Sequence, residues 1–185
     1  YDHKGRVLRS HSGNHLGGHD ISDSSLDFSG KAIYSLATHK KDANTAVQPL
    51  TIREDFTYSA QDRLLTHTHQ INGGETHLMA SNTYDELGQL VRKGVGGLFG
   101  APQPLQVVDY KYNIRGWLKE INSTDNLQQM GAPADLFAFK ISYDAANDNV
   151  PGIRALYNGN ISQTYWRTAG DNVLRKYSYR YDDMN

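Results

Sequence analysis

The histidines of this chain are the residues whose chemistry and spacing most invite a functional interpretation; there are 8. His11, His15 and His19 lie four residues apart, and His67 and His69 would share one face of a strand. A zinc site needs about four converging ligands. The first group falls in a Gly- and Ser-rich stretch with no helix to align it, and the second pair has no evident third ligand. The pattern therefore predicts solvated side chains and no bound metal.

Carboxylates, serines and glycines offer other routes to catalysis, and none has the required pattern. Glu54-Asp55 and Asp182-Asp183 are adjacent pairs, and neighbours on a strand point to opposite faces and cannot share a proton. No Gly-x-Ser-x-Gly elbow and no HExxH motif occur. The glycine-rich stretch 94–100 lacks the Lys-Ser/Thr ending of a phosphate-binding loop. We therefore expect no enzymatic activity, no catalytic residue and no cofactor.

The composition favours an all-β chain. It contains 12 Tyr and 17 Gly, with 38% hydrophobic residues and a mean hydropathy of -0.65. Strand-forming aromatics and turn residues thus outweigh the long aliphatic runs of a buried parallel sheet. A net charge of -1 gives no electrostatic reason to expect nucleic acid as a partner. The absence of cysteine excludes disulfides and thiol catalysis, and no apolar run is long enough for a transmembrane helix.

A short motif recurs along the chain and predicts its architecture. In its clearest copy, residues 84–90, a Tyr-Asp pair precedes a glycine turn and an aliphatic residue. An aromatic residue closes one strand, Asp or Asn opens the turn by bonding its own backbone, and Gly supplies a positive φ. Each copy therefore predicts a β-hairpin. The motif positions are Tyr1, Asp2, Gly5, Tyr58, Asp62 (where other copies have Gly), Tyr84, Asp85, Gly88, Tyr112, Asn113, Gly116, Tyr143, Asp144, Tyr181 and Asp182.

The spacing between copies is elastic: successive motif tyrosines from Tyr58 to Tyr181 are 26, 28, 31 and 38 residues apart. A helical solenoid needs a stiffer period, whereas a ribbon of hairpins absorbs length changes in its loops. We therefore expect one stretch of antiparallel hairpin repeats over 1–185, forming a curved ribbon. Its approximate units are 1–30, 31–72, 73–104, 105–135, 136–157 and 158–185.

Alternation of residue types predicts the individual strands. Residues 12–30 indicate a long loop or degenerate hairpin, and 40–48, 94–104 and 145–152 indicate connections. Asn72-Gly73-Gly74 is the strongest hairpin turn. Residues 126–130 fit a turn of helix as well as an irregular loop. Strands are expected at 5–11, 31–38, 50–58, 64–71, 77–84, 90–93, 107–112, 117–122, 136–143, 161–167 and 173–181.

The motif resembles the repeat Tyr-x-Tyr-Asp-x-x-Gly-Arg-Leu of the RHS/YD-repeat family, over nearly the whole chain. Residues 157–161, followed by Tyr165-Trp166-Arg167, are similar to the version found in RHS-type proteins of Bacteroidetes. The chain departs from the pattern at Asp62, at Asn113 and after Tyr143-Asp144, where no turn glycine follows soon. The resemblance rests on Tyr1-Asp2 with Gly5-Arg6-Val7, Tyr84-Asp85 with Gly88-Gln89-Leu90, Tyr110-Lys111-Tyr112-Asn113 with Gly116-Trp117-Leu118, and Tyr179-Arg180-Tyr181-Asp182.

The resemblance implies a hollow β-shell in a secreted or cell-surface bacterial protein. Such a shell encloses or displays a C-terminal effector or toxin, so the implied partners are the rest of the parent chain and that effector. The C-terminal core region, which in many family members cleaves the chain by an aspartyl-protease-like reaction, has no counterpart in this sequence. The sequence opens within one copy of the motif and ends within another, which predicts a segment of a longer repeat protein.

The aromatic residues have two open interpretations. The motif tyrosines, placed regularly at the turns, would cover the neighbouring hairpin. Alternatively, Trp117, Tyr165 and Trp166 would stack on sugar rings, which predicts a carbohydrate-binding module of the cell surface or cell wall. A ribbon of this kind also leaves unpaired edge strands, so edge-to-edge self-association of the chain is expected.

Overall fold

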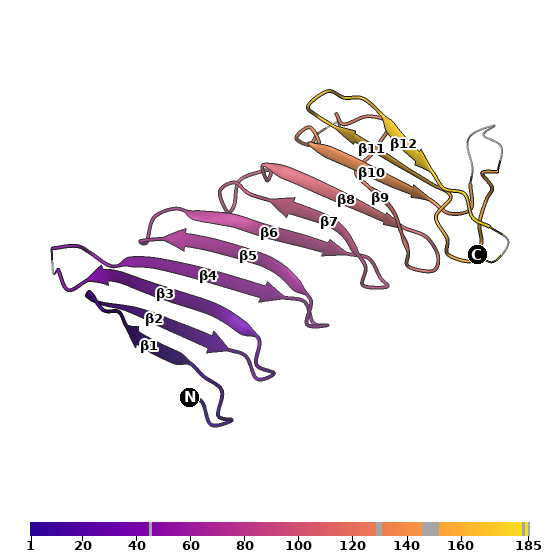
Figure 1. Cartoon of the computed structure of the whole chain (residues 1–185). Helices are drawn as coiled ribbons and strands as arrows, with labels where there is room; N and C mark the ends of the chain where they lie inside the picture. Colours follow the sequence, from indigo (N-terminus) through magenta and orange to yellow (C-terminus); the bar gives the residue numbers. More distant parts are fainter. Residues whose placement is uncertain (45, 129–130, 146–151, 183, 185) are drawn as a thin grey trace. The chain divides into compact units, whose positions relative to one another are not determined.

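The computed structural model describes the chain except for residues 45, 129–130, 146–151, 183 and 185. Every regular element in the described part is a β-strand, and the strands pair in antiparallel fashion (Figure 1). The expected all-β fold of antiparallel hairpins is confirmed. The chain divides into two compact units, unit 1 (Tyr1–Asn82 and Val95–Pro104) and unit 2 (Thr83–Gly94 and Leu105–Asn185).

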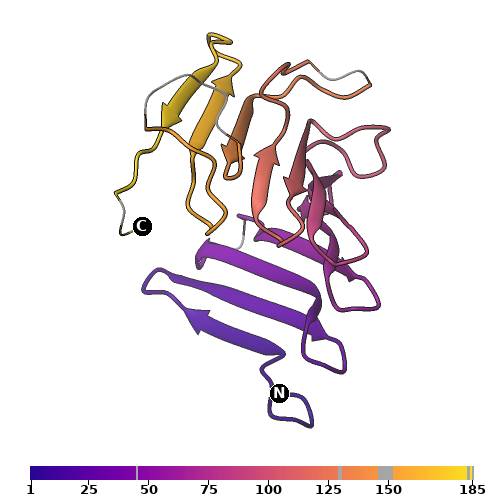
Figure 2. The ribbon, with the colours of Figure 1, turned by 90° about the vertical axis from the view of Figure 1, so that its right-hand side faces the viewer.

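Unit 1 is a sheet in which each strand pairs with the next strand of the chain. Its strands lie side by side in both views, coloured indigo to magenta (Figures 1 and 2). The strands are β1 (Arg9–Gly13), β2 (Gly17–Leu26), β3 (Ala32–Asp42), β4 (Leu50–Tyr58), β5 (Leu64–Ile71) and most of β6 (Thr76–Tyr84).

In unit 2, too, each strand from β8 to β12 pairs with the next strand of the chain. One register row runs from Tyr110 through Ile121 and Phe139 to Trp166. Paired residues share a face, so this row places three aromatic side chains and Ile121 on one face of the unit 2 sheet. The strands are most of β7 (Leu90–Val95), β8 (Gln106–Tyr112), β9 (Leu118–Ile121), β10 (Phe137–Ser142), β11 (Gln163–Thr168) and β12 (Arg175–Ser178).

Few apolar side chains are buried. Among the described residues of unit 1 the buried hydrophobic set is Ala80, and in unit 2 it is Val107, Leu127, Ala138 and Leu156. A sheet of this kind is stabilised by its ladder bonds and by rows of cross-strand side-chain pairs, each contributing roughly 0.2–1 kcal/mol. The turns that fix the register of these rows therefore matter more here than in a protein with a deep core.

Two predictions about local structure are wrong or incomplete. Residues 17–26 form β2, one of the longer strands, where a long loop or degenerate hairpin was expected. Its polar residues pair across the sheet with other polar residues, such as Asp20 with His39 and Ser24 with Ser35. Since both faces of this sheet are accessible, β2 carries no apolar alternation. The helical turn considered at 126–130 is absent from Asn126–Gln128, and residues 129–130 lie outside the described part.

Several strand boundaries also differ from expectation. β1 begins at Arg9 rather than at residue 5, and β3 continues to Asp42 through part of the expected connection. β11 begins at Gln163, and β12 covers Arg175–Ser178 instead of 173–181. The connection expected at 145–152 lies mostly outside the described residues. The remaining strands start and end within one or two residues of the predicted positions, because turn residues fix both ends of each.

Candidate functional site: repeated turns and a polar pocket

Six turns in the described part of the chain have one geometry. In each, the first residue donates its N–H to the carbonyl of the fifth and accepts at its carbonyl from the N–H of the fourth. The fourth residue has a positive φ, between 65° and 102°. This is a type I turn closed by a bulge residue in the left-handed region. The first and fourth residues are Asp2 and Gly5, Asn14 and Gly17, Asp27 and Gly30, Ser59 and Asp62, Asp85 and Gly88, and Asn113 and Gly116.

The side chain of the first residue caps the turn. Asp2 Oδ1 accepts from the N–H groups of Lys4 and Arg6, at 2.8 and 2.9 Å. Asn113 Oδ1 accepts in the same way from Arg115 and Trp117, both at 2.9 Å. The cap needs an acceptor oxygen and no charge, so Asn113 in place of Asp leaves the turn intact. Asp62, in place of Gly, adopts a φ of 65°.

Two of the six turns, at 14–17 and 27–30, were not recognised from the sequence. Both carry the Asx-x-x-Gly half of the motif, but no aromatic residue precedes them. Asp27 Oδ1 accepts from the N–H groups of Gly30 and Lys31, at 2.7 and 2.9 Å. A search on the Asx-x-x-Gly half alone would have found both turns, and with them the two hairpins that flank β2.

The motif tyrosines connect each hairpin to the one before it. Four of them donate their hydroxyl to a backbone carbonyl that lies two residues after the positive-φ glycine of the preceding turn. In the motif this is the aliphatic position. The hydrogen bonds are Tyr58 to Ala32 at 2.9 Å, Tyr112 to Leu90 at 3.0 Å, Tyr143 to Leu118 at 3.1 Å and Tyr181 to Ile161 at 2.9 Å.

The remaining motif residues are less uniform. Tyr1 is 84% exposed, and Tyr84 closes β6 directly before the turn at Asp85. Asp144 is exposed, and no cap contact of its side chain is seen among the described residues. Asp182 Oδ1 accepts from the N–H of Met184 at 3.0 Å. Both backbone hydrogen bonds of the turn are therefore present in the six turns above. The tyrosine hydrogen bond also occurs at Tyr143 and Tyr181, which do not precede one of these six turns.

The three aromatic residues predicted to stack on sugars are each engaged with neighbours. The Trp117 ring lies 5.3 Å from that of Tyr143, and it fills the space above Gly159, where a Cβ would come within 3.0 Å of it. Trp166 packs on Tyr177 with ring centroids 4.8 Å apart. Tyr165 donates its hydroxyl to Gln163 Oε1 at 2.7 Å. Since consecutive strand residues point to opposite faces, Tyr165 and Trp166 do not form one platform.

The histidines do not gather into a cluster, and the contacts that they make are with one or two neighbouring side chains. The rings of His11 and His19 are 5.6 Å apart, and His67 stacks on Phe56 at 4.6 Å with its Nε2 3.1 Å from Glu54 Oε1. Within the described residues no group of three His, Cys, Asp or Glu side chains is arranged to hold a metal. Nor does any helix there have the length and apolar character to cross a membrane.

The adjacent carboxylates do point apart where the structure describes both. Glu54 contacts His67, while Asp55 forms an ion pair with Arg53 at 2.7 Å. The hydrogen bond from Arg53 is the main cause that lowers the pKa of Asp55. Asp183, the partner of Asp182 in the second pair, lies outside the described residues.

Hydrogen bonding and burial shift several pKa values. The backbone N–H of Arg6 is the main cause that lowers the pKa of Asp2 from 3.8 to about 2, helped by the Arg6 side chain and the Lys4 N–H against the effect of burial. The Arg175 guanidinium lowers the pKa of Asp171 in the turn at 170–172. Burial raises the pKa of Tyr112 and of Tyr143 above the usual 10.

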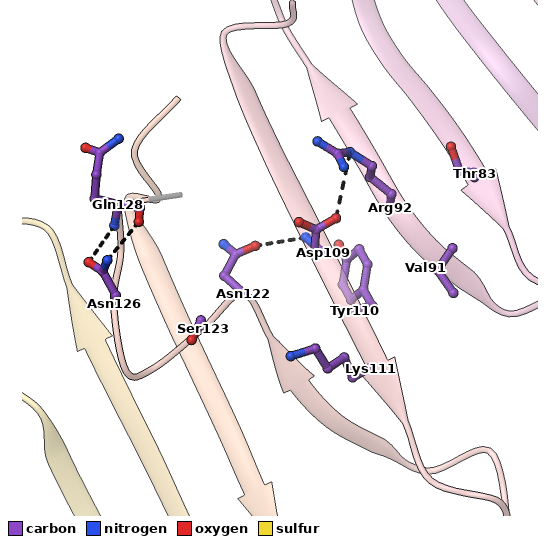
Figure 3. Close-up of a pocket in the computed structure, with 10 residues that line it drawn as sticks. All are labelled: Thr83, Val91, Arg92, Asp109, Tyr110, Lys111, Asn122, Ser123, Asn126 and Gln128. Atoms are coloured by element: carbon purple, nitrogen blue, oxygen red, sulfur yellow. Dashed lines mark hydrogen bonds and ion pairs between the residues drawn. The ribbon is translucent and has the colours of Figure 1, made fainter. Parts of the chain in front are cut away.

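Unit 2 also contains a pocket of about 620 Å³ (Figure 3). Nothing in the sequence pattern pointed to it, because its residues come from separate strands and a loop. Arg92 and Asp109 face one another across part of it, with Arg92 Nε 3.8 Å from Asp109 Oδ1. Asn122 Oδ1 accepts from the N–H of Asp109 at 2.8 Å. The lining residues are Thr83, Val91, Arg92, Asp109, Tyr110, Lys111, Asn122, Ser123, Asn126 and Gln128.

Comparison with known proteins adds no assignment: no protein-family model and no curated protein matches the chain.

Proposed function

We propose that this chain is a non-enzymatic structural segment of a secreted or cell-surface bacterial protein of the RHS/YD-repeat type. It forms part of the wall of a β-shell that encloses or displays a C-terminal effector. The observation that carries the proposal is the tyrosine hydrogen bond to the preceding copy of the motif, which recurs four times.

This hydrogen bond supports a wall because it joins repeats rather than completing a site within one repeat. The motif aspartate accepts hydrogen bonds from the backbone of its own turn, and the tyrosine hydroxyl donates a hydrogen bond to the hairpin before it. Such a rule extends a sheet one hairpin at a time, whatever the loop lengths between the copies. The small number of buried apolar side chains fits a segment whose faces are to be covered by other parts of a larger protein.

Limited proteolysis of the full-length natural protein tests the proposal. The C-terminal region should resist protease while the shell is intact and become sensitive when the wall is weakened by Tyr112→Phe together with Tyr143→Phe. Tyr157→Phe is the matched control, since Tyr157 is 72% exposed and its hydroxyl has no hydrogen bond among the described residues. A C-terminal region cleaved at the same rate in all forms, as fast as an open linker, would contradict an enclosing wall.

Binding of cell-surface glycans is a second candidate function, and the polar pocket of unit 2 is the observation in its favour. The predicted stacking residues support it less, because Trp117, Tyr165 and Trp166 already pack or hydrogen-bond within the sheet. Loss of glycan binding on Trp166→Ala would assign that function to these aromatic residues, and unchanged binding would assign it elsewhere.

A further inference from the structure

We propose that the unit 2 pocket, with Arg92 and Asp109 as its central pair, binds a neutral saccharide. This site is independent of the wall function, since none of the hydrogen bonds that join the repeats involves the side chains of this pair.

The Arg92–Asp109 pair offers both kinds of hydrogen-bonding partner to a ligand. Its N–O distance of 3.8 Å is longer than the 2.7–2.9 Å of a charge-assisted hydrogen bond. The two side chains are 52% and 44% exposed, so neither is sealed by the other. Adjacent hydroxyl groups of a sugar can therefore donate to the Asp109 carboxylate and accept from the Arg92 guanidinium at the same time.

The frame around this pair is held in place by its own hydrogen bonds. Asn122 has a φ of 54°, accepts from Asp109 N–H and donates its amide to Phe137 O, both at 2.8 Å, which links β8 to β10. Asn126 uses both ends of its amide on the backbone of Gln128, at 2.9 Å each. Both amides are engaged in these hydrogen bonds, so they hold the lining of the pocket in place and do not themselves bind the ligand. A preformed pocket lining lowers the entropic cost of binding.

Two hydroxyl groups in the lining remain available. Thr83 and Ser123 line the pocket, and neither side chain has a hydrogen-bond partner among the described residues. Together with Arg92 and Asp109 they provide donors and acceptors from four parts of unit 2, the end of β6, β7, β8 and the loop after β9 (Figure 3). A ligand rich in hydroxyl groups satisfies such a lining, whereas an apolar ligand would leave these groups desolvated and unpaired.

The charges of the pocket balance. Arg92 faces Asp109, and Lys111 Nζ binds Glu120 Oε2 at 2.7 Å. The pocket therefore has no excess positive charge to select a phosphate or a uronic acid, and no excess negative charge to select a cation. Its volume of about 620 Å³ falls within the roughly 300–1,000 Å³ typical of small-molecule sites. These features together select an uncharged polyhydroxyl ligand.

The test uses two-dimensional NMR of the whole chain titrated with cellotriose, chitotriose and galactotriose, and with trigalacturonate and inorganic phosphate as anionic probes. We expect at least one neutral oligosaccharide to shift amide signals of β8 and of residues 122–128. Arg92→Gln and Asp109→Asn should each weaken this binding about tenfold or more, the loss expected for one hydrogen bond to a charged group. Both variants should preserve the fold, because Asn122 binds the backbone of Asp109 and not its side chain, and because the Arg92 side chain is 52% exposed.

Arg53→Gln is the matched control. Arg53 and Asp55 form an ion pair of similar exposure, 45% and 43%, at a place outside the pocket, so this variant should bind as the parent chain does. The proposal is overturned if none of the three neutral probes binds, or if trigalacturonate or phosphate binds more tightly than all of them. It is equally overturned if binding survives Arg92→Gln and Asp109→Asn but is lost on Trp166→Ala.

Discussion

Replacing Tyr112 by Phe isolates the hydrogen bond between successive repeats, because the ring stays and the hydroxyl is removed. The Tyr112 hydroxyl donates to the carbonyl of Leu90 at 3.0 Å in a partly buried position. A hydrogen bond of this kind contributes about 0.5–1.5 kcal/mol net, and a buried acceptor left without its donor costs about 1–3 kcal/mol. Because water reaches a partly buried carbonyl, we expect the free energy of unfolding of unit 2 to fall by about 1–2 kcal/mol.

Urea unfolding followed by tryptophan fluorescence is a direct assay of this change. The chain has 2 tryptophans, Trp117 and Trp166, and both belong to unit 2, so the signal reports that unit. The midpoint should move to lower urea with an unchanged slope, since the surface exposed on unfolding stays the same.

Tyr157→Phe serves as the control, because it removes an exposed hydroxyl without a partner among the described residues. It should change the free energy of unfolding by less than about 0.5 kcal/mol. Equal effects of the two substitutions would refute the idea that the motif tyrosine joins repeats through its hydroxyl. The ring packing alone would then account for the presence of tyrosine at this position.

Three further predictions concern the Asn122 hydrogen bonds and the pH response of the fold. Asn122→Ala should destabilise unit 2 more than Asn122→Gly, by about 1 kcal/mol in urea unfolding, because glycine adopts the φ of 54° without strain and alanine does not; equal losses would contradict this. The contribution of Tyr112 and Tyr143 to stability should be constant up to about pH 10 and fall above it, because their raised pKa values mean that the unfolded chain loses these protons first; tyrosinate absorbance during alkaline titration measures this, and release of all tyrosine protons near pH 10 without loss of structure would oppose it. The Asp2 cap should keep its contribution above pH 3.8 and lose it as the pH falls towards about 2; a carboxyl carbon titration by NMR with a midpoint near 3.8 would argue against the hydrogen bonds from Arg6 and Lys4.

The parts of the fold that the sequence could predict are those set by local backbone chemistry. β4 and β5 have the predicted boundaries because turn residues stand at their ends. Ser59 and the positive-φ residue Asp62 fix the turn between the two strands, and Asn72-Gly73 fixes the turn after β5. β2 was missed because polar pairing across the sheet, as between Asp20 and His39, leaves no apolar pattern in the sequence. Local rules thus locate the hairpins, while the partner of each side chain depends on register.

The candidate pocket could not be predicted for the same reason. Arg92, Asp109 and Ser123 come from β7, β8 and the loop after β9, and none lies in the motif that repeats. The hydrogen bond from Tyr112 to Leu90 could not be predicted either, although both residues are motif positions. Its acceptor is a backbone carbonyl, which every residue type has, so the identity of the acceptor residue gives no signal in the sequence. The sequence identifies the donors, and the acceptors follow only from the arrangement of the hairpins.

The copies of the motif within this one chain act as a set of natural substitutions that separates structural from chemical roles. The first turn residue is Asp at position 2, Asn at 113 and Ser at 59, and all three accept N–H groups of the same turn positions. A general base would require the carboxylate, which two of these three residues lack. The fourth position is Gly in five of the six turns and Asp62 in the other, and each has a positive φ. What the copies share is therefore the hydrogen-bonding geometry of a turn, and a site that recognises a ligand has to be sought in residues that occur once, as Arg92 and Asp109 do.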